Sequence, residues 1–503
     1  MEPITNVYRQ FEYQVHSQAH APALVEGPSA WTYLSVHAWI DDLAAHLARQ
    51  GIKAAEPVGV VLGNTAIHLV AVLALARIGA ICMSLAPSKL RRLGHDDWKE
   101  LQIQHLLVPA AAAAMVGKQA ISIGPRHLNW QDKAVMAARA PAGEDAPSVS
   151  PLQDAAPHDP SGDAVFKIAL SSGATGRQKA VPWTHHQFLM QLYLQRAVRP
   201  FGPGIRLLPL VGFEATVGVD ACLRQLCAGG TVVTVPRASI DRVCAAIDAN
   251  AVSHVLSTPG IMARYVRELE PRQQRFPQLQ GLRITGGAVN EALRTRISRT
   301  ICESITVDFG ASEVGTVAVG TPQTYRESDR CAGRIAPWIQ VQVVDDADRV
   351  LGASESGRLR FRHDHLPQQY IDGRPTLRDG WFYSGDHGRV DATGLLFVES
   401  RSDDILNIGG VKVLPADIES AALSLEGVVD ACAYAVPTAT GTPVLIVAVE
   451  ARPGFDDASA LASMRASLGS RAPAKVLRVN ELPRNEMGKI LRRQLIEATK
   501  VTR

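Results

Sequence analysis

Short β-branched segments alternate with helical stretches through much of the first four hundred residues. Three of the clearest strand candidates are PVGVVLG (57–63), GGTVVTVP (229–236) and VSHVLSTP (252–259). Because strand–helix alternation is typical of parallel sheets, this pattern predicts an α/β fold. The chain has 503 residues, more than one ordinary hydrophobic core holds, so at least two domains are expected.

The amino-acid composition changes twice along the chain. Residues 138–163 are rich in Pro, Ala, Ser and Asp, which predicts a mobile linker leading into a strand, VFKIAL. A second change follows GLLFVES near residue 400. We therefore predict a large N-terminal domain (1–401), with parallel sheets flanked by helices, and a small mobile α+β domain (402–503).

Charge and cysteine usage narrow the class of protein. The net charge is +3 and no block of five or six like charges occurs, so neither nucleic acid nor an anionic membrane is an expected partner. The 7 cysteines are scattered without a CxxC pair, which indicates reduced thiols and gives no reason to expect zinc. The polar N-terminus lacks an apolar signal region, and a cytoplasmic location is the resulting prediction.

The most apolar run is HLVAVLALARIGAICMSLA, which Arg77 and Gly79 interrupt. It predicts a buried helix that ends at Gly79 and is followed by a buried strand, in preference to a membrane span.

One short stretch, LSSGATGRQKAV (170–181), combines glycines, hydroxyls and cations directly after a predicted strand. It is not a Walker loop, because Lys179 follows Gln178 instead of Gly and precedes Ala180 instead of a hydroxyl residue. Glycines still let backbone N–H groups converge on an anion, and hydroxyls and a lysine add donors. When this stretch is considered without the rest of the chain, a second interpretation stays open: a glycine-rich surface turn with solvated cations.

Four later segments, taken in order with this loop, form a known pattern. They are VDFGASEVG (307–315), WFYSGDHGRVDATG (381–394), ESRSDDILNIGGVKVLPADIE (399–419) and ELPRNEMGKILRR (481–493). Together they resemble the adenylate-forming superfamily, which contains acyl-CoA synthetases, adenylation domains of nonribosomal peptide synthetases and firefly luciferase. The resemblance covers almost the whole chain and includes WTYLSVHAWIDDLAAHLARQGI (31–52).

The resemblance implies an enzyme that joins a carboxylic acid to AMP, releases pyrophosphate and passes the acyl group to a thiol. ATP, Mg²⁺ and coenzyme A are the implied cofactors. A carboxylate is a weak nucleophile that triphosphate repels, so the reaction needs positioning and charge neutralisation more than a proton-transfer base.

The implied phosphate and metal groups come from the loop and from the FGASE motif. Glu313 matches the magnesium ligand, as suits a hard cation that prefers carboxylate oxygen, and Thr175 assists at the metal. The residues implied to hold the β- and γ-phosphates are Ser171, Ser172, Gly173, Ala174, Thr175, Gly176 and Lys179.

The implied adenosine site uses three further motifs. Phe309 matches the aromatic residue that stacks on adenine, and Asp386 and Arg401 match the ribose contacts. The remaining matches are Asp308, Gly310 and Ala311 around the adenine, Ser312 at the α-phosphate, and Gly287 and Ala288 of GGAV facing adenine and the acyl pocket.

The small domain carries the remaining implied roles. Lys489 matches the catalytic lysine that bridges the acyl carboxylate and the α-phosphate in the transition state. Asp403 falls at the hinge about which the small domain turns between the two half-reactions. Gly409 and Gly410 then move to the thiol tunnel.

The sequence departs from the family pattern in several places, of which Phe309 in place of the more usual tyrosine is a mild one. The loop has Ala174 where a hydroxyl is usual and Gln178 where proline is usual, which casts doubt on rate more than on activity. The segment PLVGFEATVGVD lacks the histidine or aromatic pair of many acyl-CoA synthetases and looks more like amino-acid-activating members. Glu214 would then receive a substrate amine, or it pairs internally; both readings stay open.

The expected substrate pocket is small and mainly apolar, with His185, Phe213, Glu214, Gly286 and Gly315 among its residues. It would suit a modest aliphatic acid, as in fatty acid metabolism, or an aryl acid. The leading prediction is an acyl-CoA ligase whose partners are a small carboxylic acid and CoA. The alternatives are an adenylation enzyme that loads an amino or aryl acid onto a carrier protein in trans, and a non-catalytic nucleotide-binding relative.

Overall fold

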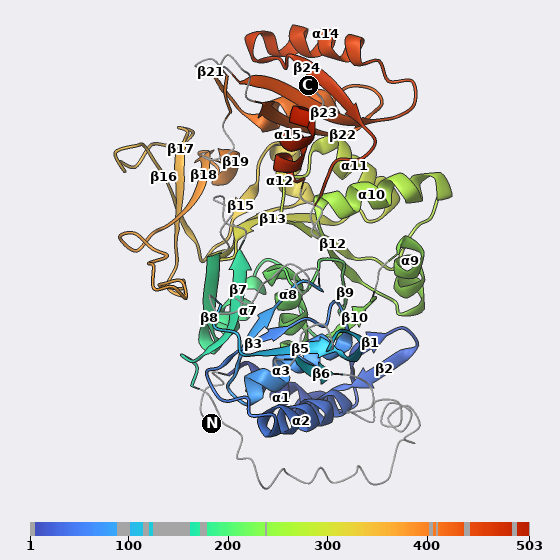
Figure 1. Cartoon of the computed structure of the whole chain (residues 1–503), viewed down its shortest axis with the longest axis vertical. Helices are drawn as coiled ribbons and strands as arrows, with labels where there is room; N and C mark the ends of the chain where they lie inside the picture. Colours follow the sequence, from blue (N-terminus) through green and yellow to red (C-terminus); the bar gives the residue numbers. More distant parts are fainter. Residues whose placement is uncertain are drawn as a thin grey trace.

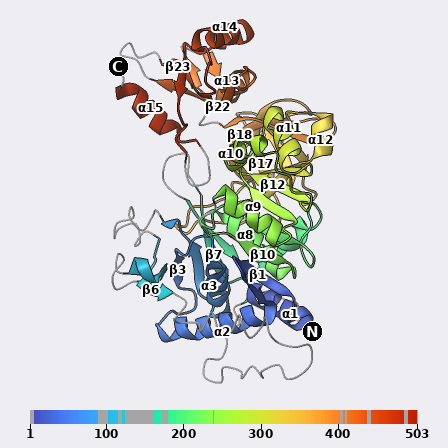
Figure 2. The ribbon, with the colours of Figure 1, turned by 90° about the vertical axis from the view of Figure 1, so that its right-hand side faces the viewer.

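A small C-terminal part stands at one end of a much larger body in this computed structural model (Figure 1), and the view turned by 90° has the same two-part outline (Figure 2). The structure describes residues 6–87, 101–113, 120–123, 161–171, 179–236, 239–401, 406–408, 411–436, 443–484 and 490–501.

The first sheet of the large body has the strand order β6-β5-β3-β4-β7-β8. Its strands are β3 (Pro57–Val60), β4 (Ile81–Ser84), β5 (His105–Pro109), β6 (Ala120–Ile123), β7 (Val165–Ser171) and β8 (Lys179–Thr184). Neighbouring strands are parallel except β7 and β8, which form an antiparallel pair. The glycine-rich loop therefore connects two adjacent strands at one edge of this sheet.

The second sheet is parallel in its N-terminal half. The order here is β13-β12-β11-β9-β10-β1-β2, and only β2 is antiparallel to its neighbour. The strands are β1 (Pro22–Glu26), β2 (Ser29–Thr32), β9 (Arg206–Pro209), β10 (Thr231–Thr234), β11 (His254–Ser257), β12 (Gly281–Thr285) and β13 (Ile305–Ala311). Strands β3, β10 and β11 lie within the three segments that alternation predicted.

Beyond β13 the same sheet continues with antiparallel strands in the order β14-β15-β19-β18-β17-β16. Their bounds are β14 (Gly315–Gly320), β15 (Gly333–Ile335), β16 (Gln340–Val344), β17 (Gly357–Arg362), β18 (Phe382–Val390) and β19 (Leu395–Arg401). The turn between β13 and β14 is therefore the point where the sheet changes direction.

Helices cover the sheets and form their cores. The described helices of the large body are α1 (Val7–Gln18), α2 (Tyr33–Arg49), α3 (Ala66–Arg77), η2 (Ala110–Ala112), α7 (His185–Gln195), α8 (Thr216–Cys227), α9 (Ile240–Ala249), α10 (Pro259–Leu269), η5 (Glu270–Arg272), α11 (Glu291–Thr300) and α12 (Pro322–Glu327). One core cluster joins α1, α2, α3 and α8, and a second joins α9, α10 and α11 to the parallel strands.

Helix α3 is apolar around nearly its whole circumference, and ten of its residues are buried. An all-apolar helix of this length is a core element. Gly79, at φ +74°, ends the segment before β4, as the sequence predicted. Among the described helices, none is both long and apolar enough to cross a membrane.

The small C-terminal part has its own sheet, β22-β23-β24, and its own core cluster. Its elements are β20 (Leu406–Ile408), β21 (Val411–Val413), α13 (Pro415–Leu423), β22 (Val428–Val436), β23 (Val444–Ala451), α14 (Asp457–Leu468), η6 (Gly469–Arg471), β24 (Lys475–Val479) and α15 (Arg492–Val501). An ion pair of 3.5 Å between Arg267 of α10 and Glu450 of β23 joins it to the large body.

The predicted α/β architecture, with a large N-terminal body and a small α+β C-terminal domain, is confirmed. The boundary between 401 and 402 stays a prediction, since residues 402–405 are outside the described ranges. Most of the predicted linker, 138–160, is also outside them.

Candidate active site

The β7–β8 hairpin brings both ends of the glycine-rich loop together. Ser171, the last residue of β7, lies opposite Lys179, the first residue of β8. The loop residues Ser172, Gly173, Ala174, Thr175 and Gly176 lie outside the described residues, so their phosphate contacts stay a prediction. Lys179 is described and closes the hairpin at the base of this loop.

The turn that carries Glu313 depends on glycine. A Cβ on Gly310 would lie 1.9 Å from the carbonyl oxygen of Gly315, and Gly315 itself has φ +74°. The β13–β14 register shifts between Phe309 and Gly310, which lets the two strands approach closely here. The turn holds Glu313 with only 6% of its surface exposed.

Tyr370 connects Glu313 to the base of the loop. Its hydroxyl donates to Oε1 of Glu313 at 3.2 Å, and Nζ of Lys179 lies 5.5 Å from its ring centroid. Burial raises the pKa of Tyr370, and the Glu313 charge raises it further, so the hydroxyl remains a donor. This residue was missed by the sequence reasoning; its only signal was a lone aromatic in the polar stretch LPQQYIDG.

Two further hydrogen bonds fix the same region. The indole N–H of Trp183 donates to the carbonyl of Ser312 at 3.2 Å, and the N–H of Ile371 donates to the carbonyl of Ala180 at 3.1 Å. Strand β8 thus contacts both the Glu313 turn and the Tyr370 segment. The structure brings Lys179, Glu313 and Tyr370 together at one end of the β7–β8 hairpin.

The residues predicted for adenine follow two adjacent strands. Strands β12 and β13 are parallel, with Thr285 opposite Asp308, so the GGAV segment and the FGASE motif leave the sheet at the same edge. Gly286 has φ +86°, and a Cβ on Gly287 would touch Pro259 at 3.4 Å. Ala288 follows in the same segment.

Phe309 is half-buried, and its ring centroid lies 6.1 Å from that of Phe361 at an interplanar angle of 70°. The ring packs against the core cluster of the antiparallel strands, as does the side chain of Ala311. One face of the predicted adenine slot is therefore supported by the protein core, while its stacking role stays a prediction.

Asp308 differs from the expectation that it lines this slot. Its side chain is 4% exposed and accepts from Arg199 at 2.6 Å and from Arg283 at 2.7 Å. Burial lowers the pKa of Arg283 to about 10, while the two guanidinium groups lower the pKa of Asp308 against the opposing effect of burial. Both arginines contact Oδ2, which places the carboxylate in a buried ion-pair network, while Oδ1 is buried without a hydrogen-bond partner among the described residues.

The two predicted ribose residues are direct cross-strand partners. Asp386 of β18 lies opposite Arg401 of β19, and Asp386 is 7% exposed. The backbone N–H of Asp386 donates to Oγ of Ser384 at 3.2 Å, and Arg401 donates to the Ser384 carbonyl at 3.4 Å. The hairpin thus places the two predicted ribose residues on neighbouring strands, and their contact with ribose stays a prediction.

His185 does not lie where the pocket prediction put it. It is 1% exposed, stacks on Phe166 with centroids 5.1 Å apart, and accepts from the backbone N–H of Val7 at 3.2 Å. Burial lowers the pKa of His185 to about 4, so the ring is neutral. It is a core residue beneath α1, because the first position of α7 points toward the core.

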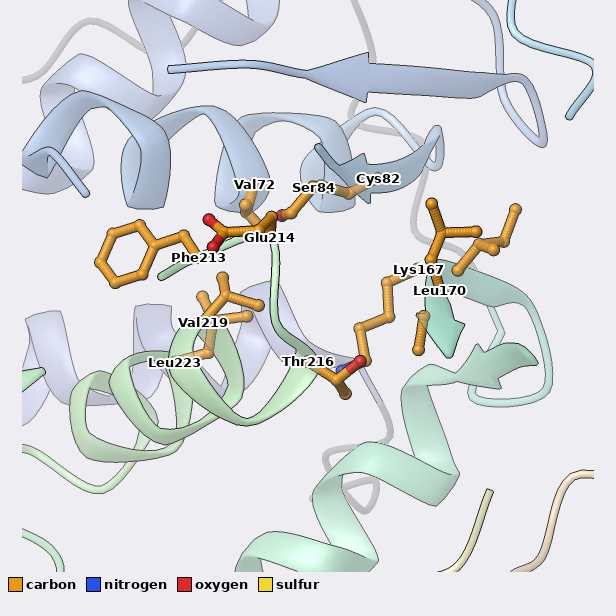
Figure 3. Close-up of a pocket in the computed structure, with 12 residues that line it drawn as sticks. Val72, Cys82, Ser84, Lys167, Leu170, Phe213, Glu214, Thr216, Val219 and Leu223 are labelled. Atoms are coloured by element: carbon orange, nitrogen blue, oxygen red, sulfur yellow. The ribbon is translucent and has the colours of Figure 1, made fainter. Parts of the chain in front are cut away.

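Phe213 and Glu214 do line a cavity beneath the end of β7 (Figure 3). The cavity is small, with a volume of about 20 Å³, which is room for a water molecule and not for an aromatic ring. Phe213 is fully buried, and its backbone N–H donates to Oδ1 of Asn64 at 2.8 Å. The lining residues are Val72, Cys82, Ser84, Lys167, Ile168, Ala169, Leu170, Phe213, Glu214, Thr216, Val219 and Leu223. Gly286 and Gly315, also predicted for the pocket, are not among them.

The remaining predicted residues lie outside the described ranges: Lys489, Asp403, Gly409 and Gly410. The strands beside the glycine pair are described, and Ile408 of β20 lies opposite Val411 of β21. The catalytic, hinge and thiolation roles stay predictions.

Glu313 suits the predicted magnesium ion as its carboxylate ligand. Among the described residues, no group of three or more His, Cys, Asp or Glu side chains is arranged to hold a metal by itself. One carboxylate that leaves the other positions to phosphate and water is how Mg²⁺ is usually bound in nucleotide enzymes. The donor set therefore fits a cation that arrives with a nucleotide.

Comparison with known proteins agrees with this arrangement. The profile described as "AMP-binding enzyme" matches residues 11–371, and that described as "AMP-binding enzyme C-terminal domain" matches residues 417–489.

Three individual proteins illustrate the similarity. The chain is 24% identical to 3-hydroxybenzoate–CoA ligase of Aromatoleum sp. (strain CIB), covering 96% of this chain and 95% of the relative. It is 25% identical to 2,3-dihydroxybenzoate-AMP ligase of Bacillus subtilis (strain 168), covering 95% and 90%. ATP-bound MatB from Rhodopseudomonas palustris has the same fold, with a TM-score of 0.84, 21% identity and 99% of both chains covered. The chain belongs to the AMP-binding enzyme family, and it is an enzyme of the adenylate-forming superfamily that its motifs indicated.

Proposed function

We propose that this enzyme is an acid–thiol ligase that activates an aromatic carboxylic acid with ATP. It forms an acyl adenylate, releases pyrophosphate and transfers the acyl group to coenzyme A. The observation that carries the proposal is the convergence of Lys179, Glu313 and Tyr370 at the loop end of the β7–β8 hairpin. A lysine and a carboxylate lie together there, where the phosphates of a nucleotide and their Mg²⁺ are expected.

The proposed reaction joins an acid to the α-phosphate of the nucleotide. The acid would lie next to the loop in which that phosphate is expected. In the proposal, Lys179 and the loop hold the phosphates, Glu313 and Thr175 hold Mg²⁺, and Asp386 and Arg401 hold the ribose. Bound Mg²⁺ supplies neutralisation of phosphate charge, and the protein supplies orientation.

Lys489 completes the proposed site from the small domain. It supplies positive charge between the acyl carboxylate and the α-phosphate as the bond forms. Movement about Asp403 then exchanges Lys489 for the Gly409–Gly410 segment, so that one site serves both half-reactions.

The aromatic class of the acid is supported by the relatives. The two described above are named for hydroxylated benzoates.

A second candidate function concerns the acceptor and the substrate. Glu214 stands where amino-acid-activating members of the family have the acid that receives the substrate amine, so an amine-bearing acid could place its amino group there. Such an acid would fit an enzyme that loads a carrier protein in trans. The two functions differ in substrate and in acceptor, and one experiment separates them.

ATP–pyrophosphate exchange over a panel of acids tests the first half-reaction. The panel holds benzoates with and without substituents, fatty acids of several lengths, and α- and β-amino acids. The proposal expects exchange with benzoates, followed by CoA-thioester formation when CoA is added. Exchange only with amino acids, or an acyl adenylate that CoA does not consume, would favour the carrier-loading function. No exchange with any acid, while ATP binds, would favour a non-catalytic role.

Lys489→Ala provides the matched test of the assigned chemistry. It should abolish exchange, yet still convert supplied acyl adenylate and CoA to thioester. Lys475→Ala is the control, because Lys475 is an exposed lysine on β24 of the same domain. Near-normal exchange by Lys489→Ala would refute its assigned role.

A further inference from the structure

The segment after helix α7 reaches both strands that carry the Glu313 turn. Arg199 lies four residues beyond the end of α7, and its side chain is 10% exposed. One terminal nitrogen of its guanidinium donates to Oδ2 of Asp308 in β13 at 2.6 Å, and the other donates to Oγ1 of Thr316 in β14 at 3.4 Å. Arg199 therefore joins the strand before the turn to the strand after it.

These two contacts fall on either side of a bulge. The β13–β14 register shifts between Phe309 and Gly310, and Gly310 lies opposite Thr316. A bulge interrupts the backbone hydrogen bonds of a ladder, so the backbone alone constrains this part of the hairpin less. The Arg199 side chain spans the interruption, because Asp308 lies before the bulge and Thr316 lies on its far side, next to the turn.

Helix α7 also packs on the turn itself. Gln191 is fully buried, and a Cβ added to Gly315 would lie 2.9 Å from its Oε1. The helix begins directly after β8, the strand that starts at Lys179. It therefore connects the base of the phosphate loop to the Glu313 turn, and Arg199 makes the contact that follows its end.

Stability alone does not explain an arginine at this position. Asp308 already accepts from Arg283 of β12, whose Nη2 lies 2.6 Å from the same Oδ2. A second buried guanidinium adds the cost of removing another charge from water, and buried ion pairs often contribute little net stability. What Arg199 adds to the existing pair is its bond to Thr316, and hence a fixed spacing between two strands.

We propose that Arg199 is a positioning residue for the nucleotide: it holds the turn that carries Phe309 and Glu313 in the conformation that binds MgATP. The inference rests on the nucleotide site of the proposed function and adds the group that keeps this site in shape. Without the bond to Thr316, fewer molecules have the competent conformation, and the apparent affinity for MgATP falls by that fraction. Bound nucleotide restores the conformation, so kcat at saturating MgATP is preserved.

The test measures the dissociation constant of MgATP by titration calorimetry, and KM for MgATP and kcat by ATP–pyrophosphate exchange. Arg199→Lys keeps the charge and one donor for Asp308, but a single ammonium group does not span both strands. Both constants should rise about 10-fold, the lower end for a hydrogen bond to a charged group. The value of kcat should change less than about twofold.

Thr316→Val removes the second acceptor and keeps the shape of the side chain. Both constants should rise about 3- to 10-fold. The double variant should match Arg199→Lys alone, because the two changes remove the same contact. If urea unfolding shows that Arg199→Lys does not fold, Thr316→Val still decides.

Arg224→Lys is the matched control. Arg224 of α8 is also a buried arginine, 6% exposed, and it donates at 3.2 Å to Asp220, a carboxylate that also accepts from Lys167. Among the described residues its hydrogen bond lies within α8 and not with β13 or β14. Both constants should therefore stay at their wild-type values.

The inference would be overturned by unchanged constants in folded Arg199→Lys, by equal rises in Arg224→Lys, or by losses that add in full in the double variant. A fall in kcat without a rise in either constant would also overturn it. Each of these results leaves the proposed function standing. Conversely, a wild type that binds MgATP but activates no acid would remove the proposed function, while calorimetry would still decide the role of Arg199.

Discussion

Removal of one oxygen atom tests the link between Tyr370 and the proposed metal ligand. Tyr370→Phe deletes the hydroxyl that donates to Glu313 Oε1 and keeps the ring beneath Lys179. A hydrogen bond to a charged acceptor contributes about 1.5–3 kcal/mol. The 3.2 Å separation is long for an O–H···O bond, so the lower end applies, about 1.5 kcal/mol or roughly tenfold in an equilibrium constant.

The assay is the Mg²⁺ dependence of ATP–pyrophosphate exchange at saturating acid. Half-maximal activity should need about ten times more Mg²⁺ in the variant, since groups that orient a metal ligand commonly change metal affinity 10- to 100-fold. Tyr434→Phe is the matched control: its hydroxyl is hydrogen-bonded to Thr499 Oγ1 at 2.9 Å within the small domain. An unchanged Mg²⁺ dependence in folded Tyr370→Phe would refute the role of Tyr370 as a positioning residue for Glu313.

Three further substitutions probe the site and its support. Gly310→Ala places a Cβ 1.9 Å from a backbone carbonyl oxygen, so the turn that carries Glu313 must shift. The rate of ATP–pyrophosphate exchange should fall about 100-fold, and a wild-type rate would contradict this geometry. Asp308→Asn leaves two buried arginines without their carboxylate; urea unfolding should show a loss of about 3–5 kcal/mol, and a loss below about 1 kcal/mol would argue against the network. Because the pKa of His185 is about 4 when folded and about 6.5 when unfolded, the unfolded chain binds the proton first as pH falls. The contribution of His185 to the free energy of unfolding is therefore fully present above about pH 6.5 and declines as the pH falls toward 4. Between pH 7 and 5, the free energy of unfolding of the wild type should fall by about 2 kcal/mol more than that of His185→Asn. Identical pH profiles would contradict the shift.

Features that depend on neighbouring residues in the chain were predictable from the sequence. Alternation located β3, β10 and β11, and the interrupted apolar run located α3 and β4, because side-chain periodicity is a local property. Residues that the motifs assign to one ligand also lie on adjacent strands in two cases, while their binding roles stay predictions. Asp386 and Arg401 are cross-strand partners, and the GGAV and FGASE segments follow neighbouring parallel strands.

Only the tertiary structure decided what faces these residues. Tyr370 and Glu313 are 57 positions apart, and Lys167 and Asp220 are 53 apart, so no local pattern pairs them. Asp308 was predicted to line the adenine slot, but two arginines distant in the sequence pair with its buried carboxylate. His185 was predicted to line the substrate pocket, but α1 covers it. The sequence by itself determined the fold class, the family and the chemistry of the motifs. Packing decided which side chains remain available to a ligand, because burial and long-range partners depend on how separate elements meet.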